Sequence, residues 1–413
     1  MNAVPGRGYA PSAPTLLAMI TALGIAQICS WGSLYYSFPL IAEAMRRDLG
    51  WAKPDLYLAV TIGLIAASLA AYPVGAAIDR GRGRVVMATA ALAAGLLLIM
   101  WSRVQSLYGF YLIFAAIGGL HAATLYEPAF AVIARRAGAS GARRGITALT
   151  LWGGFASTVF VPLIQFLLDQ VGWRGALIGL GLVNILICAP LYVFAIDPAR
   201  DQAVAGAADR PTVTGRRAVV VAAGRPVFWA LVLALVAYAA AFSILTFHLY
   251  PILLEKGLAP AAVVGVIAVI GPAQVAGRVL VWFFMAEAPV RRIGSVAVLA
   301  FPFAAAGFAF APAEFWLLAP VALFYGAANG VLTIVRGLAV PEMVDRNAYG
   351  AINGALTAPM HLVQALAPLA AAALWARDGD YDRVMLAVIA GTLVLAASFW
   401  AAALFSRRRR MSS

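Results

Sequence analysis

The chain has 413 residues, of which 63% are hydrophobic and 11% are charged, whereas an ordinary soluble domain has about 25% charged residues. Lys and Arg number 30 and Asp and Glu 17, which gives a formal net charge of +13. The charges lie in short clusters between long apolar runs, so the composition excludes a water-soluble protein and the clustering excludes a nucleic-acid-binding surface. The sequence predicts a polytopic membrane protein.

Twelve apolar runs are long enough to cross a bilayer as helices, which takes about 20 residues each. They lie at 15–41, 55–78, 85–102, 107–134, 144–168, 174–196, 226–252, 259–285, 292–311, 314–340, 348–375 and 382–406. The alternating strands of an outer-membrane barrel do not occur, so we expect an all-α membrane protein. The first run is longer than the core of a signal peptide, and we expect it to remain as a span.

Residues 197–225 form the longest polar stretch and contain Pro198, Pro211 and Gly215, a composition typical of a flexible linker. We therefore expect a six-helix bundle at residues 1–196, a cytoplasmic linker at 197–225 and a second six-helix bundle at 226–413. With both termini in the cytoplasm, twenty Lys and Arg residues lie in inside segments and eight in outside loops. This asymmetry satisfies the positive-inside rule and supports that orientation. We expect a multi-pass protein of the bacterial inner membrane.

The two halves look like diverged copies of one another. Residues 108–144 and 315–349 share an aromatic-rich start, a middle of small residues (Gly118-Gly119 and Gly326-Ala327) and a charged turn. Two parallel repeats of six spans are the plan of a large class of secondary transporters.

The turn after the second span reads Gly75-Ala-Ala-Ile-Asp79-Arg80-Gly-Arg-Gly-Arg84. Asp79 can accept hydrogen bonds from a helix N-terminus, where the macrodipole favours an anion, and Arg80 and Arg84 can reach acids or carbonyls of other spans. Such contacts would bias one access state over the other. Alternatively, the basic residues only set the orientation in the membrane.

This turn resembles the loop motif of the major facilitator superfamily, although its second glycine lies one position later than in the family pattern. Gly172-Trp173-Arg174 between spans five and six is another common feature of that family. The resemblance covers nearly the whole chain and implies twelve spans in two pseudo-symmetric bundles, with spans one, four, seven and ten around a central cavity. Arg278 also resembles the span-eight arginine of the monocarboxylate and oxalate/formate branch, with Gln274 where that branch often has an acid.

Three charged residues lie inside spans: Glu127, Arg278 and Arg336. Each costs about 2.5–3.5 kcal/mol at a helix centre on insertion scales, so such residues usually face a polar interior and serve a function. Arg278 lies roughly 13 Å from the end of its span at ~1.5 Å per residue, close to mid-membrane, and we predict that it binds an anionic solute. Arg336 either assists it or extends to the membrane surface.

Glu127 precedes Pro128 in span four, and alignment of Gly118 with Gly326 places it within one position of Arg336. An acid of one bundle and a base of the other would then meet across the cavity. A carboxyl that alternates between an apolar and an arginine-lined environment can take up and release a proton, so we predict that Glu127 couples transport to protons. The alternative is a static salt bridge that holds the bundles together.

Polar and aromatic side chains recur three or four residues apart along four spans, as on one face of a helix. These stripes are Gln27, Trp31 and Tyr35 in span one; Tyr238, Phe242 and Thr246 in span seven; Asn329, Thr333 and Arg336 in span ten; and Asn353, Thr357, His361 and Gln364 in span eleven. Single members can serve only as interhelical hydrogen bonds, worth about 0.6 kcal/mol on average. We predict solute contacts from Arg278, Arg336, Gln27, Trp31, Tyr35, Tyr238, Phe242, Asn329, Asn353 and His361.

No enzymatic, cofactor or metal site is predicted. His121, His248 and His361 lie in different spans without a Cys or acid at ligand spacing, and no glycine-rich nucleotide-binding loop is present. The expected function is secondary active transport of a small organic anion, a carboxylate, with proton symport, by a monomer in the lipid bilayer. The alternative is proton-driven export of amphipathic or aromatic compounds.

Overall fold

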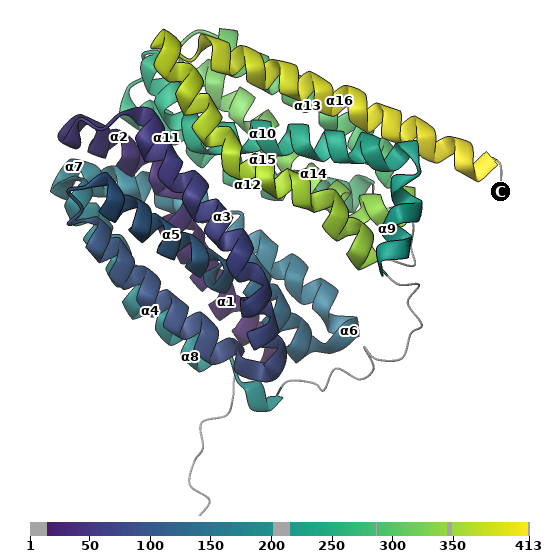
Figure 1. Cartoon of the computed structure of the whole chain (residues 1–413), viewed down its shortest axis with the longest axis horizontal. Helices are drawn as coiled ribbons and strands as arrows, with labels where there is room; N and C mark the ends of the chain where they lie inside the picture. The colour runs from purple at the N-terminus through teal and green to yellow at the C-terminus, as the bar shows by residue number, and fades with distance from the viewer. Residues whose placement is uncertain (1–14, 201–214, 286, 345–348, 412–413) are drawn as a thin grey trace, which may run out of the picture.

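The computed structural model describes residues 15–200, 215–285, 287–344 and 349–411. All regular secondary structure within these ranges is helical, which confirms the all-α prediction. The helices form two bundles, coloured purple to teal and green to yellow in Figure 1. Of the expected linker between them, residues 201–214 lie outside the described ranges.

The N-terminal bundle contains α1 (Leu16–Ser30), α2 (Phe38–Leu49), α3 (Lys53–Ala77), α4 (Gly83–Trp101), α5 (Leu107–Thr124), α6 (Tyr126–Gly153), α7 (Ala156–Val183) and α8 (Ala189–Ala195). Turns of π-helix at Trp31–Tyr36, Ile78–Arg82 and Asn184–Cys188 join α1 to α2, α3 to α4 and α7 to α8, and a 3-10 turn follows at Pro198–Arg200. Gly172, with φ +66° and ψ 177°, interrupts α7 and separates two predicted spans. Only glycine adopts such a backbone readily.

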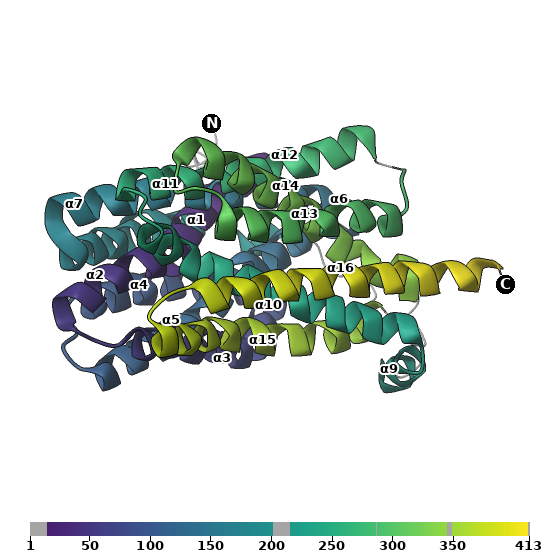
Figure 2. The ribbon, with the colours of Figure 1, turned by 90° about the horizontal axis from the view of Figure 1, so that it is seen from above.

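The C-terminal bundle follows the short helix α9 (Gly215–Ala223). It contains α10 (Pro226–Glu255), α11 (Pro260–Ala268), α12 (Ile270–Phe284), α13 (Val290–Phe310), α14 (Phe315–Ala339), the π-helical turn Val340–Val344, α15 (Tyr349–Asp378) and α16 (Asp382–Met411). Figure 2 shows α10 running beside α15 and α16 over most of its length.

Eleven stretches of the described ranges are long and apolar enough to cross a membrane, against twelve predicted spans, because Arg144–Arg200 holds two spans in succession. Three of the predicted spans contain an interruption of the helix. Span four breaks at Leu125, between α5 and α6; span five breaks at Gly154 and Phe155, between α6 and α7; and span eight breaks at Val269, between α11 and α12. In addition, α6 continues from span four into span five, where the sequence analysis expects a break in the helix.

Prolines inside the spans free backbone carbonyls that side chains of other helices then bind. A proline lacks the amide hydrogen that would bond the carbonyl four residues earlier. Pro128 frees the Thr124 carbonyl, which accepts hydrogen bonds from Gln27 Nε2 at 2.8 Å and Tyr192 Oη at 3.2 Å. The lost bond also accounts for the break in span four, since Leu125 takes an extended conformation and α6 begins one residue later.

Three more carbonyls that lie four residues before a proline are bound in the same way. Hydrogen bonds run from Ser243 Oγ to Gln364 O at 2.7 Å, from Tyr57 Oη to Phe247 O at 2.7 Å and from Thr158 Oγ1 to Ala268 O at 2.8 Å, ahead of Pro368, Pro251 and Pro272. The last two bonds connect the N-terminal bundle to the C-terminal bundle. Pro251 and Pro272 therefore each leave a carbonyl free for a hydrogen bond between the bundles.

Close helix pairs within each bundle depend on glycine. A Cβ atom on Gly118 of α5 would lie 2.0 Å from the carbonyl oxygen of Gly63 in α3, and a Cβ atom on Gly330 of α14 would lie 2.0 Å from the Gln274 carbonyl oxygen of α12. Small residues allow such close approach between membrane helices. The two contacts occupy corresponding places in the two halves, between spans two and four and between spans eight and ten.

We name the two ends of the molecule by their residues. The linker end carries the turn Ile78–Arg82, the turn Pro198–Arg200 and α9; the opposite end, which carries the connections at residues 50–52, 256–259 and 379–381, is called the Lys53 end. In Figure 1 the ribbons of the bundles lie together around α2, α3 and α11 and diverge toward α6 and α9. The hydrogen bonds from Tyr57 and Thr158 join the bundles in the Lys53 half.

Candidate solute-binding site

A turn of π-helix in the first span gathers aromatic side chains near the centre of the molecule. The turn Trp31–Tyr36 has the wider helical geometry that is rare overall and frequent at functional sites. The centre of the Trp31 ring lies 5.1 Å from that of Tyr35, 6.2 Å from Tyr36 and 5.0 Å from Tyr126 of α6. Tyr36 and Tyr126 are absent from the predicted site; their places next to Tyr35 and Glu127 are the signal that could have indicated them.

Arg278 of α12 is half-buried and reaches from the C-terminal bundle to the N-terminal bundle. Its Nη1 donates to the Thr150 carbonyl of α6 at 3.0 Å, and its charge interacts with the hydroxyl groups of Tyr36, Tyr126 and Tyr238. Its Nε is buried and has no hydrogen-bond partner among the described residues. Arg278 thus borders the aromatic cluster with one donor unused.

Glu127 and Arg336 interact electrostatically although they belong to different bundles. No ion pair between them within 4.0 Å occurs in the described part of the chain. Glu127 is exposed despite its place mid-span, and the break at Leu125 puts it in the first turn of α6, where the helix dipole favours an anion. The Arg336 guanidinium carbon lies 5.7 Å from the centre of the Tyr238 ring.

The polar stripe of α14 joins α10 through buried hydrogen bonds. Tyr238 Oη donates to Asn329 Oδ1 at 3.0 Å, and Asn329 Nδ2 donates to the Tyr325 carbonyl at 3.0 Å. Tyr238 and Asn329 are 4% and 2% exposed. Water therefore does not reach their polar atoms, which bind each other instead. Phe242 stacks on Tyr238 with ring centres 5.6 Å apart.

Two predicted residues on α15 lie on its more open side. Asn353 is half-buried, and its backbone carbonyl accepts a hydrogen bond from Thr357 Oγ1 at 2.9 Å. His361 is exposed and interacts electrostatically with Arg336. His361 therefore lies in the same electrostatic environment as the Glu127 and Arg336 pair.

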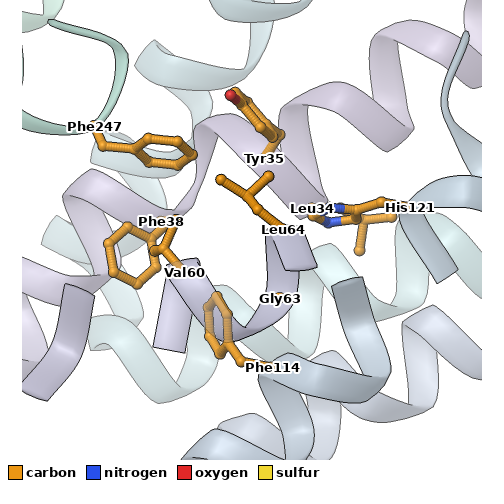
Figure 3. Close-up of a pocket in the computed structure, with 9 residues that line it drawn as sticks. All are labelled: Leu34, Tyr35, Phe38, Val60, Gly63, Leu64, Phe114, His121 and Phe247. Carbon is orange, nitrogen blue, oxygen red and sulfur yellow. The ribbon is translucent and has the colours of Figure 1, made fainter. Parts of the chain in front are cut away.

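Two predicted residues of span one are fully enclosed. Gln27 is 0% exposed inside the N-terminal bundle and binds the Thr124 carbonyl, so a solute does not reach it in this conformation. Tyr35 is 4% exposed and packs on Phe247 of α10, with ring centres 4.9 Å apart. Figure 3 shows both rings beside a cavity of about 10 Å³ that His121 also lines, which is room for roughly one water molecule.

The predicted gating turn binds its own bundle. Arg84 Nε donates to the Ile196 carbonyl, and Arg84 Nη2 lies 3.6 Å from Asp197 Oδ1, both at the end of the sixth span. Gly75 is half-buried and Arg80 is exposed. The side chain of Asp79 lies outside the described part of the structure, so the gating hypothesis for it stays a prediction.

A charged and aromatic cluster closes the Lys53 end. Lys53, the first residue of α3, is 2% exposed; its Nζ lies 2.8 Å from Glu255 Oε1 of α10 and 3.2 Å from Tyr381 Oη. The same Nζ lies 3.6 Å from the centre of the Trp375 ring, and Trp375 Nε1 donates to Glu255 Oε2 at 2.8 Å. The sequence analysis counts Lys53 only as a charge of an outside loop.

His248 and Tyr57 extend this cluster toward the centre. The imidazole of His248 stacks on the Tyr57 ring with centres 3.9 Å apart, and its Nδ1 lies 2.8 Å from Tyr381 Oη. We call Lys53, Tyr57, His248, Glu255, Trp375 and Tyr381 the Lys53 latch. Because Lys53 and Tyr57 belong to the N-terminal bundle and the other four to the C-terminal bundle, the bundles cannot separate at this end without breaking the contacts of Lys53 and Tyr57.

Comparisons with known proteins bear on what such a site does. The model of the family described as Major Facilitator Superfamily matches residues 23–368. Monocarboxylate transporter 13 of Rattus norvegicus is 26% identical over 399 residues, which are 92% of this chain and 85% of that protein. Monocarboxylate transporter 11 of Mus musculus is 33% identical over 159 residues, a match that spans only 35% of either protein.

Two solved structures share the fold at low sequence identity. A crystal structure of the nucleoside transporter NupG superposes with a TM-score of 0.73 at 15% identity, over 94% of this chain and 99% of that one. A bacterial homolog of the human lysosomal transporter Spinster, in an inward-facing and unoccupied conformation, gives a TM-score of 0.68 at 14% identity, over 96% and 98% of the two chains.

Proposed function

This chain belongs to the major facilitator superfamily and is a membrane transporter; from that premise we propose that it carries a small organic carboxylate by alternating access. The observation that supports an anion is a pair of buried hydrogen-bond donors without acceptors at the aromatic cluster. Arg278 Nε is one and Trp31 Nε1 is the other, among the described residues. Both side chains border Tyr36 and Tyr126.

A carboxylate is the ligand whose chemistry fits two such donors. An ionised carboxylate only accepts hydrogen bonds and has two oxygens to offer, and its bonds to a guanidinium are about twice as strong as those between neutral groups. A buried donor without an acceptor costs about 1–3 kcal/mol, which a bound anion would recover. The rings of Trp31, Tyr36, Tyr126 and Tyr238 would enclose the carbon skeleton.

We further propose that the linker end faces the cytoplasm, as the excess of basic residues at that end indicates. The closed Lys53 end would then face the opposite side of the membrane, and Glu127 would be reached from the cytoplasm. Exposure of Glu127 together with its interaction with Arg336 supports a proton-binding role for this carboxyl.

Ligand-induced stabilisation of the purified protein tests the carboxylate proposal. A ligand at a hundred times its Kd stabilises the binding state by about 2.7 kcal/mol. Small aliphatic and aromatic monocarboxylates should therefore raise the unfolding temperature, whereas their methyl esters, which have no negative charge, should not. Arg278→Gln should abolish the response, and Arg278→Lys should weaken it at least tenfold in apparent Kd, because an ammonium group does not offer the paired N–H groups of a guanidinium.

The matched control is Arg103→Gln, which removes an exposed arginine at the Lys53 end and should leave the response intact. Stabilisation by the esters or by amphipathic cations, with none by the carboxylates, would refute the proposal and favour export of aromatic compounds instead.

A further inference from the structure

His248 is a buried titratable side chain that the proposed transport mechanism does not use. It lies in α10, is 0% exposed and belongs to the Lys53 latch, far along the chain from both Lys53 and Tyr381. Both of its ring nitrogens have partners, so the hydrogen bonds around it define which protonation state the closed latch accepts.

The partners of His248 assign the neutral imidazole. Nε2 lies 2.9 Å from the carbonyl oxygen of Pro368, which only accepts, so Nε2 carries the hydrogen. Nδ1 lies 2.8 Å from Tyr381 Oη. Burial raises the pKa of Tyr381 well above its usual value, so its hydroxyl keeps its hydrogen and donates it to Nδ1. The Tyr381 oxygen in turn accepts from Lys53 Nζ at 3.2 Å.

A second hydrogen on the ring breaks this arrangement. Nδ1 would become a donor, the hydroxyl hydrogen of Tyr381 would lose its acceptor, and a cation would lie one hydroxyl group away from the Lys53 ammonium. A buried donor without an acceptor and two like charges in a low dielectric both raise the free energy of the closed latch.

The other charged groups around His248 are already engaged. Glu255 binds Lys53 and Trp375, while Glu43 of α2 binds Arg46 at 2.9 Å and Arg47 at 3.3 Å. Arg46 adds a further positive charge 6.0 Å from the Trp375 ring.

The Tyr57 ring stacked on His248 would stabilise a protonated imidazole, but it provides no acceptor for the hydroxyl hydrogen of Tyr381 that this protonation displaces.

We propose that His248 is a proton-binding site of the Lys53 latch, and that a proton taken up from the medium on the Lys53 side opens the latch. When the bundles separate, Lys53 and Tyr57 leave with the N-terminal bundle, while Tyr381 and Pro368 stay with His248. The Lys53 ammonium then no longer opposes a charge on the ring, and the Tyr381 hydroxyl can donate to water while its oxygen accepts from a protonated Nδ1. The open state then binds a proton that the closed state refuses, and a ligand shifts a conformational equilibrium by the ratio of its affinities for the two states. The inference rests on alternating access alone and is independent of the solute and of Glu127.

The test measures opening at the Lys53 end without any solute. Spin labels at Gln105→Cys and Ala313→Cys occupy exposed positions on the two bundles at that end; the native Cys29 and Cys188 are buried, and the parent chain treated with the same reagent gives the background. The measurement is made in lipid nanodiscs and gives the ratio of molecules with a long interspin distance (open) to molecules with a short one (closed). This ratio should rise about 30-fold between about pH 8 and about pH 5, if the imidazole of the open state titrates near pH 6.5 and that of the closed state stays neutral.

His248→Gln separates the proposal from a general effect of pH. Glutamine can donate to the Pro368 carbonyl and accept from Tyr381, as the neutral imidazole does, yet it does not titrate; the labelled variant should stay closed at both pH values. Asp169→Asn, which removes an exposed titratable carboxyl of the Lys53 end outside the latch, should open with pH as the parent does. A parent chain without pH-dependent opening, or His248→Gln that opens like the parent, would overturn the proposal.

Tyr381→Phe provides a second measurement should His248→Gln fail to fold. It removes the hydroxyl that binds the neutral imidazole and Lys53 in the closed latch. The closed state is then less stable, so opening should begin at a higher pH than in the parent; an unchanged midpoint would contradict the role of Tyr381. Because no solute is present, failure of the carboxylate proposal would leave these outcomes unaffected.

Discussion

Gly118 and Gly119 are neighbours in α5, yet only one of them touches another helix. A Cβ atom on Gly118 would lie 2.0 Å from the Gly63 carbonyl oxygen of α3, whereas a Cβ atom on Gly119 would have no neighbour within 4 Å. Contacts under about 3 Å cannot be kept, and the carbonyl is part of a helical backbone that cannot turn away. The residue type alone does not distinguish these two positions; the facing helix does.

Gly118→Ala should therefore separate α3 from α5 and lower stability by about 1–3 kcal/mol, in the range of overpacked cores. Gly119→Ala is the matched control: it makes the same change in helix propensity, worth up to about 1 kcal/mol in favour of alanine, without a clash, and should be neutral or stabilising. Unfolding of both variants by SDS in mixed micelles measures the difference. Equal stabilities would show that the helices can move apart at no cost.

At the scale of helices, hydrophobic runs predict the spans and single residues decide where they break. Pro128 and Pro272 are visible in the sequence, but the helices that bind the carbonyls they free are not, because the donors Gln27 and Thr158 lie 97 and 110 positions from their acceptors. Such partners depend on how the bundles pack, which periodicity within one helix does not contain.

The same reason separates the parts of the candidate site that the sequence indicates from those it does not. Glu127 and Arg278 can be proposed from the sequence because a charge in an apolar span is costly, and their roles stay predictions. Lys53 reads as an ordinary loop lysine and His248 as a single histidine in an apolar run. Their roles appear only when Tyr381, 328 and 133 positions away, is placed between them.

The hydrogen bond from Tyr57 to the Phe247 carbonyl tests whether a carbonyl freed by a proline stabilises the contact between the bundles. Tyr57→Phe keeps the ring that stacks on His248 and removes only the donor, which should cost the closed conformation about 1–3 kcal/mol through an unsatisfied carbonyl. Pro251→Ala restores an amide hydrogen for that carbonyl, so Tyr57→Phe should cost clearly less in the Pro251→Ala background. The closed fraction is measured from the interspin distances at Gln105→Cys and Ala313→Cys near pH 8. It is compared among the parent, Tyr57→Phe, Pro251→Ala and the double variant, which together form a double-mutant cycle.

Tyr72→Phe, at a tyrosine that is 85% exposed, is the control and should leave the closed fraction unchanged in both backgrounds. Identical effects of Tyr57→Phe with and without Pro251 would mean that the proline has no part in the contact.

At the scale of the whole molecule, the proposed roles of the latch and the central site would divide the transport cycle between two ends. The bundles are joined at the Lys53 end by Lys53, Tyr57 and His248, while Glu127 is exposed near the middle and lies within electrostatic reach of Arg336. A carrier can couple protons to a solute only if the proton site changes its surroundings between access states. Under the proposed coupling, Glu127 and Arg336 would meet this condition, because they belong to different bundles and no close ion pair joins them among the described residues.

Glu127→Gln tests this coupling, since it keeps the shape of the side chain and removes its titration. In proteoliposomes, a gradient of one pH unit can drive about tenfold accumulation at one proton per solute; this accumulation should vanish in Glu127→Gln, while exchange of labelled for unlabelled solute at equal concentrations continues. Glu314→Gln, at an exposed carboxyl of the Lys53 end, should retain both activities. Loss of exchange together with accumulation would instead assign Glu127 to holding the bundles in register, because a carboxyl used only for coupling is not needed when no net proton movement is required.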